Sequence, residues 1–96
     1  MQKLREELEQ LREQKRVTFH ELDRLIHKIV RTYERYFPKF QTKSKGSRVV
    51  YHLGVEELWP ISLEKEHKGR DSVLPRYAKL ALNLIEEMLD YVEQRP

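Results

Sequence analysis

The hydrophobic period of this chain changes from 3.6 residues to two and back again, and that change leaves few folds open. Apolar residues recur at helical spacing before Pro38, alternate with polar ones between Phe40 and Leu63, and return to helical spacing after Pro75. Two helices that cover one face of a small antiparallel sheet bury the apolar surfaces of both sheet and helices. We therefore expect an α+β fold of helix, three-stranded antiparallel sheet and helix, with one extra helix at the N-terminus.

The first sixteen residues predict a separate short helix. They are almost entirely strong helix formers, and Leu4, Leu8 and Leu11 form a narrow apolar seam. Two heptads at most cannot hold a coiled coil alone. We expect residues 1–16 to be an extension of a domain spanning residues 17–96. The extension would dock on that domain or on a second copy in a homodimer, with a disordered tail as the alternative.

The first helix of the domain has the clearest start signal in the chain. Thr18 and Glu21 have the spacing of a capping box, and an apolar stripe follows from Leu22 to Tyr33. Pro38 should end this helix, because the residue before a proline resists helical backbone.

Three strands are expected next, over residues 40–44, 47–53 and 57–63, with turns at Lys45-Gly46 and at Gly54. Alternation along the second strand separates an apolar face, with Val49, Tyr51 and Leu53, from a face with Arg48, Val50 and His52.

The third strand should place Trp59 in the core, because Trp59, Ile61 and Leu63 share one face. Pro60 cannot donate a ladder hydrogen bond, which predicts an edge strand or a bulge. A charged loop over residues 64–71 then leads to the last helix, which should open at Ser72 or Leu74 with Pro75 in its first turn.

Composition favours one soluble domain with a basic middle. The 96 residues include no cysteine and no apolar run long enough to span a bilayer, so we expect a cytoplasmic protein without membrane contact. Residues 38–79 carry nine basic and five acidic groups, whereas residues 80–96 carry one basic and four acidic groups. A basic segment indicates a phosphate-binding surface, with a solvated surface without a ligand as the alternative.

Several motifs in residues 17–92 resemble those of one family. Gly46-Ser47 opens a strand, Tyr51 follows the serine by four residues, Pro60 lies in the third expected strand, and the last helix begins Leu74-Pro75-Arg76-Tyr77. This pattern is similar to the HicA family of toxins from bacterial toxin–antitoxin pairs.

The resemblance implies a fold of the double-stranded-RNA-binding type and metal-independent endoribonuclease activity, as an mRNA interferase. It also implies silencing by a HicB-type antitoxin protein and no cofactor. The family usually has a histidine directly after Gly-Ser, where this chain has Arg48. The resemblance therefore leaves open whether catalysis is altered or lost.

Arg48 can hold a phosphate but cannot act as a base, since arginine keeps its proton at neutral pH. The substitutes are His52, on the same strand face, and His67, in the charged loop. Their alternatives are a half-exposed strand residue and a solvated loop residue without a role. His20 and His27 are interpreted as ordinary helix-surface residues.

The expected RNA contacts are basic residues at the turn, the loop and the start of the last helix: Lys43, Lys45, Arg48, Lys65, Lys68, Arg70, Arg76 and Lys79. Scattered surface charge is the alternative. No metal-ligand spacing and no glycine-rich phosphate loop is present, so neither a metal nor a cofactor is expected. Three functions remain open: an RNA-cleaving toxin, a non-catalytic RNA-binding module and a protein-interaction domain.

Overall fold

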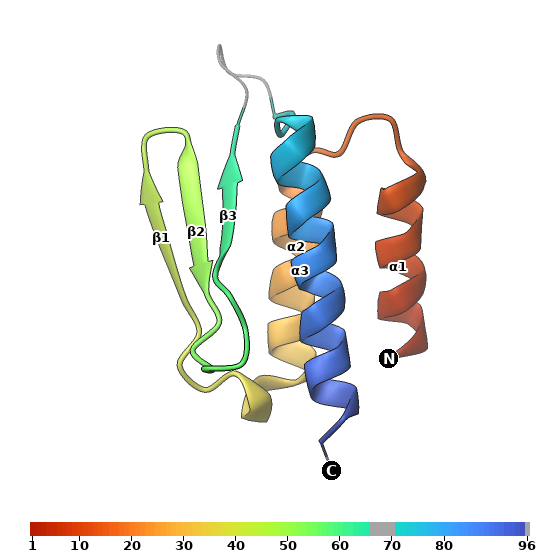
Figure 1. The fold of residues 1–96 in the computed structure, drawn as a ribbon, viewed down its shortest axis with the longest axis vertical. Coiled ribbons are helices and arrows are strands. Elements are labelled where there is room, and N and C mark those ends of the chain that lie inside the picture. The colour runs from red at the N-terminus through yellow and green to blue at the C-terminus, as the bar shows by residue number, and fades with distance from the viewer. Residues whose placement is uncertain (66–70, 96) are drawn as a thin grey trace.

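A computed structural model describes residues 1–65 and 71–95, which form three layers (Figure 1). The sheet packs on one side of a helix pair, α2 and α3, and α1 packs on the other side. The elements are α1 (Gln2–Glu13), α2 (Phe19–Thr32), the 3₁₀ turn η1 (Glu34–Tyr36), β1 (Gln41–Lys45), β2 (Arg48–His52), β3 (Ile61–Glu64) and α3 (Pro75–Glu93). This confirms the α+β prediction. No helix in the described ranges is long and apolar enough to cross a bilayer.

The sheet is antiparallel in the order β1-β2-β3, so β2 is central. Lys45 pairs with Arg48 across the hairpin, and Tyr51 pairs with Ile61 across the other ladder. The predicted alternation along β2 is confirmed, because Val49 and Tyr51 are buried and Arg48 and His52 are exposed. One sheet face therefore packs on the helices and the other is open.

The α2 start also agrees with the sequence prediction. The Thr18 hydroxyl accepts from the Glu21 N–H at 3.1 Å, and the Thr18 N–H donates to the Glu21 carboxylate at 3.0 Å. The end differs, because α2 stops at Thr32 and a 3₁₀ turn follows before Pro38. This turn brings Phe37 into the core, where its ring lies 5.9 Å from that of Tyr91, so tertiary packing ends the helix early.

Helix α1 docks on its own chain and is not a disordered tail. Leu4, Leu8 and Leu11 are all buried and belong to the single apolar core of the described residues. Arg5 pairs with Asp90 at 2.9 Å, and Lys28 pairs with Glu7 at 2.7 Å. The ion pairs are partly exposed to solvent and contribute little, so burial of the leucines dominates the docking energy.

Trp59 corrects the sequence prediction, since its side chain is 74% exposed. The third strand starts at Ile61 rather than at residue 57, so neither Trp59 nor Pro60 lies within it. The chain turns at Gly54, with φ of +78°, and the Leu58 N–H donates to the Val55 carbonyl. This turn takes residues 55–60 away from the extended path that would have buried Trp59. The expectation of an edge strand is confirmed for β3.

Candidate nucleic-acid interface

The open face of the sheet is basic near the hairpin. Directly paired residues share a face, so Lys43 lies beside Val50, and Lys45 beside Arg48. Lys43, Lys45 and Arg48 are all exposed. On the neighbouring strand, Glu64 is the partner of Arg48.

Arg48 and Glu64 form a cross-strand ion pair, with 3.5 Å between guanidinium and carboxylate. The Arg48 side chain remains 53% exposed. An exposed pair of this kind is worth roughly 0–1 kcal/mol. The pair orients Arg48 on the open face and leaves donors available to an anion.

The hairpin tip depends on Gly46, whose φ is +60°. A side chain at this position would meet nothing within 4 Å, so the glycine serves backbone conformation alone. Ser47 follows it, and its carbonyl accepts from the Lys65 N–H at 3.1 Å. The Gly46-Ser47 motif therefore joins the hairpin to the end of β3.

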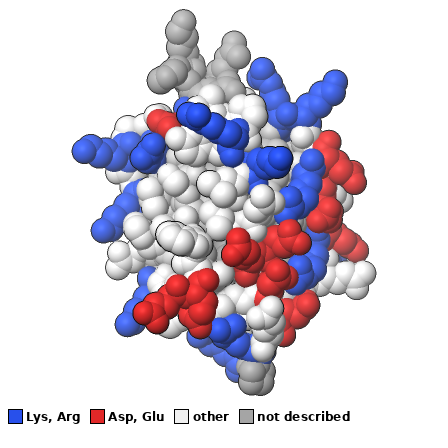
Figure 2. Space-filling view, viewed as in Figure 1, with Lys and Arg blue, Asp and Glu red and all other residues white. Residues whose placement is uncertain are grey.

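The start of α3 lies at the same end of the molecule as the hairpin tip (Figure 1). Arg76 and Lys79 are exposed in its first turns. Figure 2 shows Lys and Arg side chains prominent toward this end, whereas most Asp and Glu on this face lie lower or along α1, among further Lys and Arg. We call Lys43, Lys45, Arg48, Arg76 and Lys79 the basic end.

Not every predicted contact belongs to this surface. The Lys65 ammonium lies over the Phe19 ring, 4.3 Å from its centroid, on the helix side of the sheet. The predicted residues His67, Lys68 and Arg70 lie outside the described residues.

His52 lies on the open face, as predicted, but at the opposite end of β2 from Arg48. Four strand residues correspond to roughly 13 Å, which is too far for both groups to act on one phosphate. Among the described residues, none forms a hydrogen bond or an ion pair with the His52 side chain. Nothing in this arrangement orients His52 as a base.

Tyr51, the third motif residue, is buried on the helix-facing side of β2. Its hydroxyl donates to the Asp23 carboxylate at 2.6 Å. Burial, together with this bond to a carboxylate, raises the pKa of Tyr51. Tyr51 is a core residue, as predicted.

His27 is more than an ordinary surface residue, because it completes a polar cluster that sequence reasoning missed. Its Nε2 lies 3.3 Å from the same Asp23 oxygen that accepts from Tyr51. Its ring packs edge-on against Phe40 at 5.5 Å. The four-residue spacing of Asp23 and His27 was the available signal. The cluster lies on the helix side of the sheet, away from the basic end.

His20, in contrast, is exposed, as expected.

Neither a metal site nor a known relative indicates a function for the described residues. Within residues 1–65 and 71–95, no group of three or more His, Asp or Glu side chains could hold a metal ion. Comparison with protein-family models, curated proteins and solved structures finds no match to this chain.

Proposed function

We propose that this protein binds duplex RNA through the basic end. The observation that carries the proposal is the convergence of the hairpin tip and the start of α3, which brings Lys45 and Arg48 to the same end as Arg76 and Lys79. Duplex RNA is recognised mainly by its phosphates, 2′-hydroxyls and shape, which suits separated cations on two elements.

Duplex RNA fits this surface better than single-stranded RNA. Single strands are held by stacking of bases on aromatic rings. The strand residues of the open face are Gln41, Lys43, Lys45, Arg48, Val50, His52, Ser62 and Glu64, and no Phe, Tyr or Trp is among them. Trp59 is exposed but precedes β3, at the end of the sheet away from the hairpin tip.

We further propose that binding occurs without cleavage. Arg48 occupies the position of the histidine in the HicA pattern and cannot take a proton. His52 lies too far along β2 to act on a phosphate that Arg48 holds. The HicA-like toxin with a HicB-type antitoxin remains the catalytic alternative, with His52 and His67 as its bases.

The test is binding of a fluorescent RNA duplex at two salt concentrations, with a parallel cleavage gel in EDTA between pH 6 and 8. We expect affinity to fall steeply with salt and the RNA to stay intact. Arg48→Glu should weaken binding by roughly tenfold, whereas the matched reversal Lys3→Glu on α1 should have little effect. Equal losses in the two variants would refute the interface. Cleavage that disappears in His52→Ala would favour the toxin alternative.

A further inference from the structure

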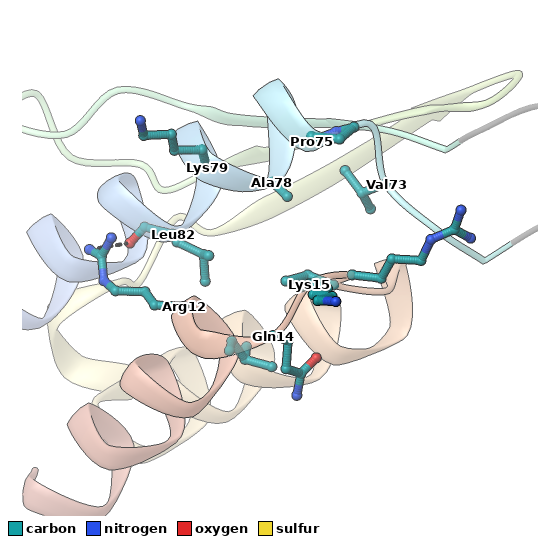
Figure 3. A pocket seen from close by; sticks show the side chains of 11 residues that line it. Arg12, Gln14, Lys15, Val73, Pro75, Ala78, Lys79 and Leu82 are labelled. Atoms are coloured by element: carbon teal, nitrogen blue, oxygen red, sulfur yellow. Dashed lines mark hydrogen bonds between the residues drawn. The ribbon is translucent and has the colours of Figure 1, made fainter.

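A groove lies between the end of α1, the connection to α2 and the first turns of α3 (Figure 3). Its volume is about 420 Å³. The buried lining residues are apolar and come from these three segments and from the residue stretch just before α3: Leu11, Val17, Val73, Ala78 and Leu82. Ligand sites of proteins fall in this range of volume, and a floor of this kind favours an apolar group.

The rim of the groove is basic. Arg12, Lys15, Arg16 and Lys79 line it, and no carboxylate is among its described lining residues. Arg12 already has charge partners, because it pairs with Glu86 at 2.5 Å and with Glu9 at 3.5 Å. In the described part of the chain, no carboxylate pairs with the other three cations. They therefore offer uncompensated positive charge beside an apolar floor.

The arrangement of these cations distinguishes among anionic ligands. Lys79 extends from α3 and Lys15 from the α1–α2 connection, on different sides of the opening (Figure 3). A single phosphate would need cations that converge on one point. Cations spread around an apolar floor instead match separated carboxylates on either side of an apolar side chain.

An RNA ligand satisfies this site less well. The described lining includes no aromatic ring on which a base could stack. A sugar–phosphate backbone has no apolar group to displace water from Leu11, Ala78 and Leu82. We propose that this groove binds an acidic peptide segment of a partner protein, with an apolar side chain on the floor and carboxylates at Lys15, Arg16 and Lys79.

The groove lies away from the open sheet face and shares only Lys79 with the basic end. It is built on α1, which lies on the opposite side of α2 and α3 from the sheet (Figure 1). RNA on Lys43 and Arg48 would leave Lys15 and Arg16 accessible. The proposal therefore does not depend on RNA binding.

The test is a nuclear magnetic resonance titration of the whole ¹⁵N-labelled chain with a synthetic peptide of Asp and Glu around one central Leu. We expect the amide signals of Val17, Ala78 and Leu82 to shift. The double variant Lys15→Glu/Arg16→Glu should weaken binding by roughly tenfold, because two attractive charges become repulsive. A matched peptide with Ser in place of Leu should bind about tenfold more weakly or worse.

Lys43→Glu/Lys45→Glu is the matched control variant, since it reverses two charges on the open sheet face. The proposal fails if this variant loses as much peptide affinity as the groove variant, if the Ser peptide binds equally well, or if millimolar peptide leaves the groove amides unshifted. Groove shifts caused by oligouridine but not by the peptide would assign the site to nucleic acid. Shifts that appear on raising the protein concentration alone would assign it to a second copy. Duplex RNA binding, measured on the same variants, reports separately on the proposed function.

Discussion

The Tyr51 hydroxyl donates to the Asp23 carboxylate at 2.6 Å, and this bond joins the central strand of the sheet to α2. Tyr51 is fully buried, so an ionised phenolate there would be desolvated and would face a second negative charge. His27 lies 3.3 Å from the same oxygen of Asp23. A single carboxylate thus links two aromatic residues from different layers of the fold.

This bond predicts a loss of stability in alkali. The pKa of Tyr51 is raised in the folded protein above its ordinary value of 10.0, so above that pH the unfolded state releases a proton that the folded state keeps. The free energy of unfolding should therefore fall as pH rises past 10, by up to about 1.4 kcal/mol per pH unit. Urea unfolding at pH 8 and pH 10.5 measures it. Tyr51→Phe should cost about 1 kcal/mol at pH 8 and should lack this alkaline loss.

The capping box of α2 predicts a loss of stability in acid. Hydrogen bonding to the Thr18 N–H lowers the pKa of Glu21 below its ordinary value of 4.5. The unfolded chain then binds the proton first as pH falls, so this stabilisation is present above pH 4.5 and is lost below it. Glu21→Gln should be less stable than the parent at pH 6, and the difference should shrink toward pH 3 in urea unfolding. A constant difference would mean that the carboxylate charge has no role. Thr18→Ala should cost about 1 kcal/mol.

The glycines of the two turns should differ in their tolerance of alanine. A Cβ at Gly54 would lie 2.8 Å from the Lys39 carbonyl carbon, whereas one at Gly46 would meet nothing within 4 Å. Both have positive φ, which costs alanine roughly 1–2 kcal/mol. We expect Gly46→Ala to lower the free energy of unfolding by only that amount. Gly54→Ala should lower it further, because the Lys39 backbone must move to make room for the Cβ. Thermal unfolding of the two variants compares them directly, and equal losses would contradict the close approach to Lys39.

The docking of α1 should contribute several kcal/mol to the free energy of unfolding. Leu8 is 1% exposed and belongs to the common core. Leu8→Ala should lower the free energy of unfolding by about 2–5 kcal/mol, with one cooperative transition. Lys3→Ala, an exposed change on the same helix, is the control and should stay within about 0.5 kcal/mol. A small loss for Leu8→Ala would mean that α1 detaches at little cost in solution.

Trp59 should be nearly dispensable for stability. Because its ring is 74% exposed, Trp59→Ala should change the free energy of unfolding by less than about 1 kcal/mol. As it is the single tryptophan, its fluorescence should be quenched by iodide as strongly in the folded protein as in urea. Protection from iodide in the folded state would mean that Trp59 is buried and would contradict its exposed position.

The strongest sequence signals of this fold are local ones. The capping box at Thr18, the alternation along residues 48–52 and Pro75 at the start of α3 are all observed as predicted. Each depends on neighbours in the chain: a side chain bonded three residues away, a period of two, or a fixed φ. The sequence alone was therefore sufficient for the order of the elements and for the two faces of the central strand.

Only the tertiary structure decided which distant residues share a surface. In the structure, Trp59 is exposed and α1 docks on its own chain. Asp23 contacts both His27 and Tyr51, and Lys15 and Lys79 line one groove. Periodicity specifies which face of an element is apolar, but the position of one element against another depends on packing of whole surfaces. That is why the cations could be counted from the sequence, while their gathering at one end required the fold.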